Sequence, residues 1–144
     1  MDRLSYRTSY KYPKKILLIE NNKIEISKFK RAIAAEFSDY TISLANNGNE
    51  ALSVLENSFP DIILLDLNMP ETTGIEFLKI VKNNSKIKHI PIIVLTTSNN
   101  DKDIKECYKL GVASYVLKSL KYEDYKTEIN AIIKYWSLNE FIEK

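Results

Sequence analysis

Four polar residues stand at the ends of short apolar runs that have the length of strands, and their types suit one kind of chemistry. They are Glu20, Asp66, Thr96 and Lys118. A carboxylate can attack phosphorus as a nucleophile and form an aspartyl-phosphate. A lysine ammonium can neutralise phosphoryl charge, and a threonine hydroxyl can donate a hydrogen bond to a phosphoryl oxygen. These types indicate phosphoryl chemistry at Asp66, provided that the fold brings the four together.

The apolar runs alternate with longer segments of helical period, and five such alternations are typical of βα units. The predicted strands span Ile16–Glu20, Tyr40–Ala45, Ile62–Leu67, Ile92–Thr96 and Tyr115–Leu117. The third run is apolar everywhere except at Asp66, as expected for a parallel strand buried on both faces. We therefore predict an α/β fold with a doubly wound five-stranded parallel sheet, in the flavodoxin-like order 2-1-3-4-5 with helices on both faces.

In this strand order the first and third strands are neighbours, roughly 4.8 Å apart, so Glu20 and Asp66 would share one pocket. Two carboxylates that close repel each other. A hard divalent cation removes the repulsion, and Mg²⁺ prefers one or two carboxylates together with waters and phosphate oxygens. The sequence therefore predicts a magnesium site beside Asp66.

The length, charge and hydropathy of the chain exclude several other classes of protein. A chain of 144 residues is long enough for one domain, which we place at residues 14–144 after a loose arm at residues 1–13. The 21 basic and 19 acidic residues are scattered, which disfavours a nucleic-acid surface. No apolar run is long enough to cross a membrane, and the lone Cys107 cannot form an internal disulfide. We therefore expect a cytoplasmic protein that binds neither nucleic acid nor membrane.

From Lys14 to Ile133 the sequence resembles the receiver domains of two-component response regulators. Three motifs carry the resemblance: Leu65-Asp66-Leu67-Asn68-Met69-Pro70, Val94-Leu95-Thr96-Thr97-Ser98 and Ser114-Tyr115-Val116-Leu117-Lys118. Their order and spacing fit the family. The tail, Tyr135-Trp136-Ser137-Leu138-Asn139-Glu140, looks like that of single-domain receivers that accompany phytochrome-type or related sensor kinases.

The resemblance implies that a histidine kinase or phosphotransfer protein is the partner, and that Asp66 takes the phosphoryl group with the help of Mg²⁺ in a phosphorelay. Such a protein promotes its own phosphorylation and dephosphorylation and is not a conventional enzyme. Movement of Thr96 and inward rotation of Tyr115 would follow. The implied metal ligands are Glu20, Asn21, Asp66 and the backbone carbonyl of Asn68.

Three positions depart from the family pattern. Asn21 stands where receivers usually have a second acidic residue, and an amide oxygen can coordinate a metal but carries no charge. Ser119 replaces a proline that follows a cis peptide bond; because a cis bond before any other residue costs roughly 2.5 to 4 kcal/mol, we predict a trans bond between Lys118 and Ser119. Thr73 replaces an aspartate or asparagine, and we expect that change to be minor.

Two other functions remain open. A pseudo-receiver, a constitutive interaction module that is not phosphorylated, is favoured by Asn21 and Ser119. A flavodoxin-like enzyme or flavin carrier is disfavoured because the loops after the strands lack a glycine-rich phosphate cradle. His89 and Cys107 have no partner residues at catalytic or metal-binding spacing and are interpreted as structural.

The last predicted helix, from about Tyr122, carries an apolar stripe with Trp136 and Phe141 that runs past the usual end of a receiver. We expect this extension to mediate a homodimer or a contact with the kinase.

Overall fold

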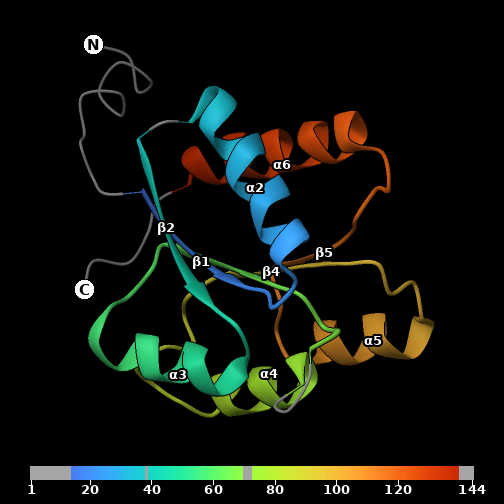
Figure 1. The fold of residues 1–144 in the computed structure, drawn as a ribbon. Helices are drawn as coiled ribbons and strands as arrows, with labels where there is room; N and C mark the ends of the chain where they lie inside the picture. The colour runs from blue at the N-terminus through green and yellow to red at the C-terminus, as the bar shows by residue number, and fades with distance from the viewer. Residues whose placement is uncertain (1–13, 38, 70–72, 140–144) are drawn as a thin grey trace.

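The chain forms a five-stranded parallel sheet in the order β2-β1-β3-β4-β5, as predicted (Figure 1). The structure is a computed structural model that describes residues 14–37, 39–69 and 73–139. The strands are β1 (Lys14–Ile19), β2 (Tyr40–Ala45), β3 (Ile62–Leu65), β4 (Ile92–Thr96) and β5 (Ser114–Leu117). The predicted arm at residues 1–13 lies outside the described residues.

Helices cover both faces of the sheet, as predicted. Figure 1 shows α2 (Lys23–Glu36) and α6 (Tyr122–Ser137) on one face, and α3 (Gly48–Asn57), α4 (Gly74–Lys82) and α5 (Asp101–Lys109) on the other. Because successive side chains of a strand point to opposite faces, β3 contributes to two hydrophobic cores. Ile63 and Leu65 enter the core beneath α3 and α4, and Ile62 and Leu64 enter the core beneath α2 and α6. This central strand is therefore buried on both faces.

Polar side chains start four of the helices by accepting hydrogen bonds from backbone N–H groups that the first turn leaves unpaired. Asn22, Asn47, Thr73 and Asn100 are these caps. Thr73 thus serves as a helix cap in place of the residue usual in the family. At the end of α5, Gly111 has a φ of 89°, a left-handed conformation that favours glycine, so the predicted end of this helix is confirmed.

The apolar side of α6 faces the sheet, as its helical period predicts. Ile129 and Ile133 are fully buried, and Trp136 is half-buried against the same core. The predicted partner stripe therefore overlaps the core at Trp136, because the helix continues along the sheet as far as Ser137. Tyr135 and Leu138 remain exposed, and Phe141 lies outside the described residues.

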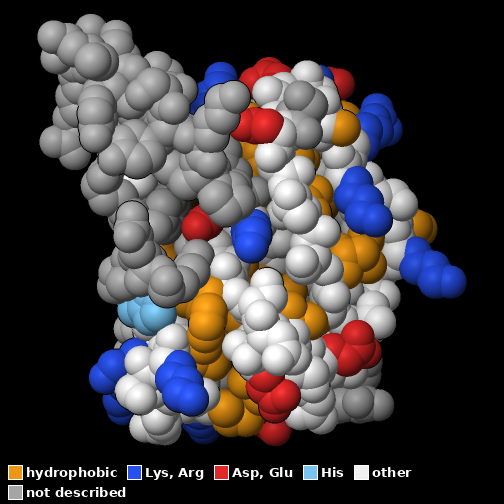
Figure 2. Space-filling model, turned by 90° about the vertical axis from the view of Figure 1, so that its left-hand side faces the viewer, with side chains coloured by type: hydrophobic (Ala, Val, Ile, Leu, Met, Phe, Trp, Pro, Cys, Tyr) orange, Lys and Arg blue, Asp and Glu red, His pale blue; other side chains and the backbone are white. Residues whose placement is uncertain are grey.

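Figure 2 shows the face that lies at the left of Figure 1, which includes the edge strand β2. Where this face is formed by described residues, basic and acidic side chains are scattered among hydrophobic ones and form no stripe of one sign. Within the part of the chain that the structure describes, no helix is both long and apolar enough to cross a bilayer.

The core position of Cys107 predicts an unreactive thiol. Burial, together with the smaller effect of the nearby charges of Asp103 and Glu106, raises the pKa of Cys107 to about 11. Because the thiolate is the nucleophile, we expect an aromatic disulfide reagent at pH 8 to label the native protein roughly a hundredfold more slowly than the chain in denaturant. Equal rates in the two conditions would contradict this placement of the thiol.

Candidate functional site

The four candidate residues meet at the carboxyl edge of the sheet. Glu20 follows β1, Asp66 follows β3, Thr96 ends β4 and Lys118 follows β5. The parallel register continues through them, because the Asp66 N–H donates to the Ile19 carbonyl at 3.2 Å and the Lys118 N–H donates to the Thr96 carbonyl at 2.8 Å. The juxtaposition predicted from strand order is therefore present.

Burial sets this edge apart from the rest of the molecule. Within the described residues, the polar or charged residues that are buried as a whole are Glu20, Asp66 and Thr96, which are 3%, 8% and 0% exposed. Carboxylates are rarely buried unless they are paired, because removing a charge from water is costly. Their concentration at one place indicates that the site has a use other than stability.

A cavity of about 300 Å³ opens at this point. Five of the predicted site residues line it, namely Glu20, Asn21, Asp66, Asn68 and Lys118, whereas Thr96 and Tyr115 do not. Glu25 and Lys28 of α2 also line the cavity, and the sequence analysis did not identify either of them. The cavity therefore contains three carboxylates and two ammonium groups, which is a larger set of charges than predicted.

The Lys118 ammonium lies among carboxylates from two elements. Its Nζ is 2.9 Å from Glu20 Oε1 and 3.0 Å from Glu25 Oε1, and its side chain is only 7% exposed. Burial acts to lower the pKa of Lys118, but the hydrogen bonds to Glu20 and Glu25 and the charges of Asp66 and Glu20 outweigh burial and raise the pKa. The lysine therefore remains charged inside the cavity, held by β1 and α2.

Glu20 is shared between two donors. Its Oε1 accepts from Lys118, and its Oε2 accepts from the backbone N–H of Asn22 at 3.2 Å. Burial raises the pKa of Glu20 despite the opposing effect of Lys118, and the charge of Asp66 adds to the increase. A cation placed between Glu20 and Asp66 would relieve this electrostatic cost.

The two asparagines in the loop after β1, Asn21 and Asn22, have different surroundings. The Asn22 side chain caps α2 by accepting from the N–H groups of Ile24 and Glu25. Asn21 is exposed and lines the cavity, at the position that the resemblance predicts for a metal ligand.

Hydrogen bonds connect Asp66 with β4 and β5. The Asn68 N–H donates to Asp66 Oδ1 at 3.3 Å, and Asn68 Nδ2 donates to Thr96 Oγ1 at 3.4 Å. Thr96 Oγ1 also accepts from the Ser98 N–H at 3.4 Å, and the Tyr115 hydroxyl donates to the Ser98 carbonyl at 2.7 Å. Burial raises the pKa of this half-buried tyrosine. The predicted switch residues are thus in one network with Asp66.

The residue after Lys118 is anchored to α6. The Glu128 carboxylate accepts from both the N–H and the hydroxyl of Ser119, with 3.1 Å between Ser119 N and Glu128 Oε1. No cis peptide bond occurs within the described residues, so the trans bond predicted between Lys118 and Ser119 is confirmed. Glu128 is a further residue that sequence reasoning missed.

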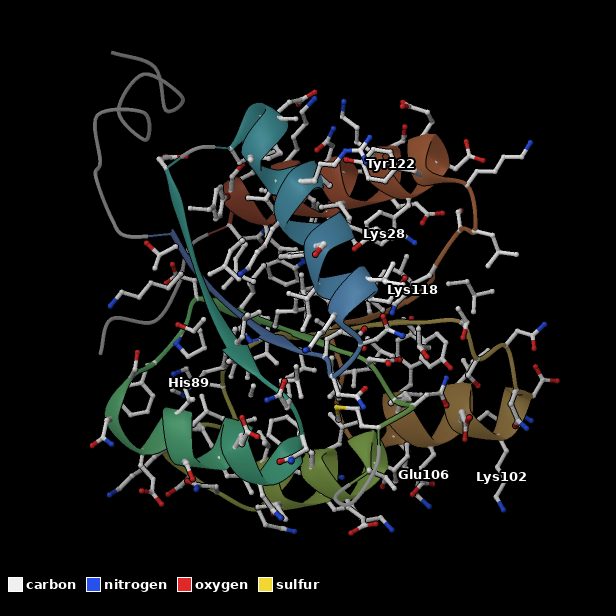
Figure 3. All side chains as sticks on the ribbon, in the orientation of Figure 1. Lys28, His89, Lys102, Glu106, Lys118 and Tyr122 are labelled. Atoms are coloured by element: carbon white, nitrogen blue, oxygen red, sulfur yellow. The ribbon has the colours of Figure 1, made fainter. Side chains whose placement is uncertain are left out.

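His89 and Cys107 do not join the site. Figure 3 places His89 toward the end of the sheet opposite to Lys118, in the segment that precedes β4. Cys107 is buried in the core on the side of α3 and α4. Their interpretation as structural residues is therefore consistent with where they lie.

Comparisons with known proteins agree with this geometry. Residues 16–130 match the response regulator receiver domain family. Response regulator Rcp1 of Synechocystis sp. is 35% identical over 131 residues, which are 86% of this chain and 89% of that protein. FilR2 of Methanothrix harundinacea, a probable methanogenesis regulatory protein, is 35% identical over 127 residues, which are 84% and 82% of the two chains.

Two solved structures are similar over most of the chain. The phosphorylated cyanobacterial phytochrome response regulator RcpA has a TM-score of 0.87 and 34% identity, and the match covers 92% of this chain and all of RcpA. The Mn²⁺-bound form of Rcp1 has a TM-score of 0.82 and 31% identity, again over 92% of this chain and all of that one.

The close contact of Gly74 with the Asp66 loop predicts a sensitive position. A Cβ at Gly74 would lie 2.8 Å from Leu67 Cδ2, 2.9 Å from Leu67 Cα and 3.2 Å from the Asp66 carbonyl oxygen. Because the backbone itself must move, we expect Gly74→Ala to lower the free energy of unfolding by about 1 to 3 kcal/mol and to shift the Asp66 and Leu67 amide resonances.

Gly111→Ala is the matched control for this prediction. Its added Cβ has open space but a strained φ, so it should lower stability without shifting the Asp66 resonance. Unchanged Asp66 and Leu67 resonances in a folded Gly74→Ala protein would show that the loop does not depend on this contact.

Proposed function

Because the chain belongs to the response regulator receiver domain family, we propose that it is a signalling switch in which Asp66 accepts a phosphoryl group from a histidine kinase or phosphotransfer protein. The observation that carries the proposal is one cavity lined by the buried carboxylates Glu20 and Asp66 and by Lys118. The buried Thr96 joins them through Asn68, which lines the cavity and donates to the Thr96 hydroxyl. The phosphorylated form of the similar protein RcpA supports it.

In the proposed step an Asp66 carboxylate oxygen attacks the phosphorus of a phosphohistidine. The new bond joins this oxygen to phosphorus, the bond between phosphorus and the histidine nitrogen breaks, and the nitrogen takes up a proton. Lys118 is already charged and buried in the cavity, so it can neutralise phosphoryl oxygens without first being desolvated. The Thr96 hydroxyl would donate to a phosphoryl oxygen after exchanging its present contacts.

The donor set fits Mg²⁺. No group of three or more His, Cys, Asp or Glu side chains within the described residues is arranged to hold a metal ion. Mg²⁺ does not need such a group, because it prefers one or two carboxylates and keeps several waters. Glu20, Asp66, the Asn21 side chain and the Asn68 carbonyl would hold it, and when bound it would neutralise charge on the phosphoryl oxygens. The Mn²⁺-bound form of the similar protein Rcp1 supports this assignment.

The network from Asp66 to Tyr115 supplies a route for the signal. When Thr96 turns toward the phosphoryl group, it gives up its bonds from Asn68 and from the Ser98 N–H. The Ser98 carbonyl accepts a hydrogen bond from the Tyr115 hydroxyl, and Ser98 lies in the loop that follows Thr96 at the end of β4. Movement of Thr96 would therefore change the position of Tyr115 and the surface formed by β5 and α5.

The alternative is a pseudo-receiver that takes no phosphoryl group, and Asn21 remains its main support. Ser119 supports it less than its sequence position suggested, because Glu128 anchors Ser119 and Lys118 still lies in the cavity. Phosphorylation therefore remains the better-supported function.

We also propose that the exposed side of α6 near its end contacts the kinase or a second copy of the chain. Tyr135 and Leu138 are 60% and 59% exposed there. Replacing both with serine should weaken association measured by sedimentation, or transfer from the partner kinase, while leaving labelling by a small phosphodonor unchanged. Unaltered association and kinase transfer would remove this surface from the proposal.

Phosphorylation itself gives the direct test. Incubation with Mg²⁺ and a small phosphodonor such as acetyl phosphate should add the mass of one phosphoryl group to the intact protein. Asp66→Asn should abolish the addition, because an amide is not a nucleophile toward phosphorus under these conditions. A wild-type protein that gains no mass at saturating Mg²⁺ would favour the pseudo-receiver.

The charge missing at position 21 predicts a weak metal site. Asn21→Asp restores one unit of negative charge worth on the order of 1 to 3 kcal/mol at a site screened by water. Calorimetric titration should therefore show Mg²⁺ affinity higher by roughly ten- to a hundredfold. The metal-free variant should melt at a lower temperature, because a fourth carboxylate joins Glu20, Glu25 and Asp66 in the cavity. Unchanged Mg²⁺ affinity would show that residue 21 is not a ligand.

A further inference from the structure

Glu25 uses its side chain in an unexpected way for a residue in the first turn of a helix. It stands three residues after the cap Asn22, where a glutamate usually reaches back to the backbone N–H of the cap residue. Here Glu20 Oε2 takes the Asn22 N–H. Glu25 instead places Oε1 at 3.0 Å from Lys118 Nζ and Oε2 at 3.1 Å from Lys28 Nζ. The Glu25 carboxylate therefore binds two lysines that line the cavity and does not bond to the cap of the helix.

The position of Glu25 is fixed from both sides. The Glu25 N–H donates to Asn22 Oδ1 at 3.1 Å, and Lys28, which binds its other carboxylate oxygen, lies 4.6 Å from the centre of the Tyr125 ring on α6. Tyr125 is fully buried. Figure 3 shows Lys28 and Lys118 one above the other beside α2, below Tyr122. The contact between Glu25 and Lys118 is therefore part of the packed seam between these helices.

Glu25 is ionised at neutral pH. Burial acts to raise its pKa, but the hydrogen bonds and charges of Lys118 and Lys28 outweigh burial and lower the pKa. It thus presents a full negative charge to the Lys118 ammonium.

Glu20 faces two competing demands in the proposed function. It is the closer carboxylate partner of Lys118, and it is also a proposed metal ligand. If a cation takes the Glu20 oxygen, the buried ammonium loses that partner, and a buried charge without a partner is strongly destabilising. A second carboxylate on Lys118 removes the conflict, because the ammonium has three N–H donors and can keep one bond to Glu25.

We infer that Glu25 is a positioning residue of this site: its carboxylate holds the Lys118 ammonium in the cavity and so leaves Glu20 free to bind the metal ion. The inference rests on the proposed function of the same cavity. Without Glu25, Lys118 depends on Glu20 alone and competes with the metal for it.

Metal binding without a phosphodonor tests the inference. Glu25→Gln keeps the side-chain length but removes the charge, and we expect the Kd for Mn²⁺, measured by electron paramagnetic resonance, to rise about three- to tenfold. Glu50→Gln is the matched control, since Glu50 occupies the same position after the cap Asn47 of α3 but binds Asn46 and does not line the cavity. It should leave the Kd within about twofold of the wild-type value.

The variant Glu25→Asp distinguishes the direct contact with Lys118 from the long-range effect of the negative charge. It keeps the negative charge but withdraws the carboxylate by one methylene group, so we expect a Kd close to that of Glu25→Gln. A Kd equal to the wild-type value in Glu25→Asp would mean that only long-range charge matters, and equal values in Glu25→Gln and wild type would mean that Glu25 has no part in metal binding. Either result would overturn the inference.

A second measurement follows the ammonium directly. The ¹⁵N resonance of Lys118 Nζ, assigned by its loss in Lys118→Arg, should persist at saturating Mg²⁺ in wild type because Glu25 still holds the ammonium. It should broaden in Glu25→Gln. Loss of the resonance from wild type on adding Mg²⁺ would contradict the inference.

Labelling by acetyl phosphate distinguishes the two proposals. If the wild-type protein takes no phosphoryl group, the proposed function is wrong whatever Glu25 does. If wild type is labelled, we expect Glu25→Gln to need about three- to tenfold more Mg²⁺ for half-maximal rate. A lower maximal rate with an unchanged Mg²⁺ requirement would overturn the positioning role and leave the proposed function standing.

Discussion

The buried ammonium of Lys118 is the charge on which the polar edge of the sheet depends. Glu20 and Asp66 are almost fully buried, and carboxylates in that position are stable only when opposite charge or hydrogen bonds compensate for lost water. Lys118 supplies that charge at 2.9 Å from Glu20 and 3.0 Å from Glu25, and acts on Asp66 through space. Burying the ammonium is itself costly in free energy. The ammonium and the carboxylates therefore each lower the free-energy cost of burying the other.

This arrangement requires strands that end in register, and the two apolar cores provide it. With β3 packed on both faces, the chain has little freedom to shift the point at which Asp66 leaves the sheet. The same register places Thr96 beside Lys118 through a backbone hydrogen bond of 2.8 Å. The core is therefore rigid, whereas the hydrogen bonds around Asn68 and Thr96 are long, at 3.3 to 3.4 Å. Replacing these long hydrogen bonds by new ones costs little free energy.

The sequence was sufficient to predict the fold and the meeting of four polar residues, because both follow from apolar periodicity and from strand order. It was not sufficient for the residues that act from the sides of the cavity. Glu25 lies 93 residues from Lys118 in the chain, and its spacing from Asn22 fits an ordinary helix cap, which conceals its other role. Glu128 faces Ser119 only because α6 turns back over the sheet, and no local pattern marks it. Trp136 was expected at an interface, but the length of α6 brings it partly into the core.

The substitutions that weaken the resemblance to other receivers are best understood together with these unpredicted contacts. Asn21 leaves the loop after β1 without a second carboxylate on the side of the cavity where the metal is proposed to bind, whereas Glu25 places a carboxylate on the side of the lysine. In the proposed mechanism a carboxylate that binds the metal acts directly on the affinity for the cation, while the Glu25 carboxylate, which binds Lys118 and Lys28, acts through the position of the Lys118 ammonium. Ser119 follows the same logic, because the Glu128 carboxylate anchors the loop in which the family has a proline. A receiver can therefore depart from the usual residues at two positions and still present a charged lysine to Asp66.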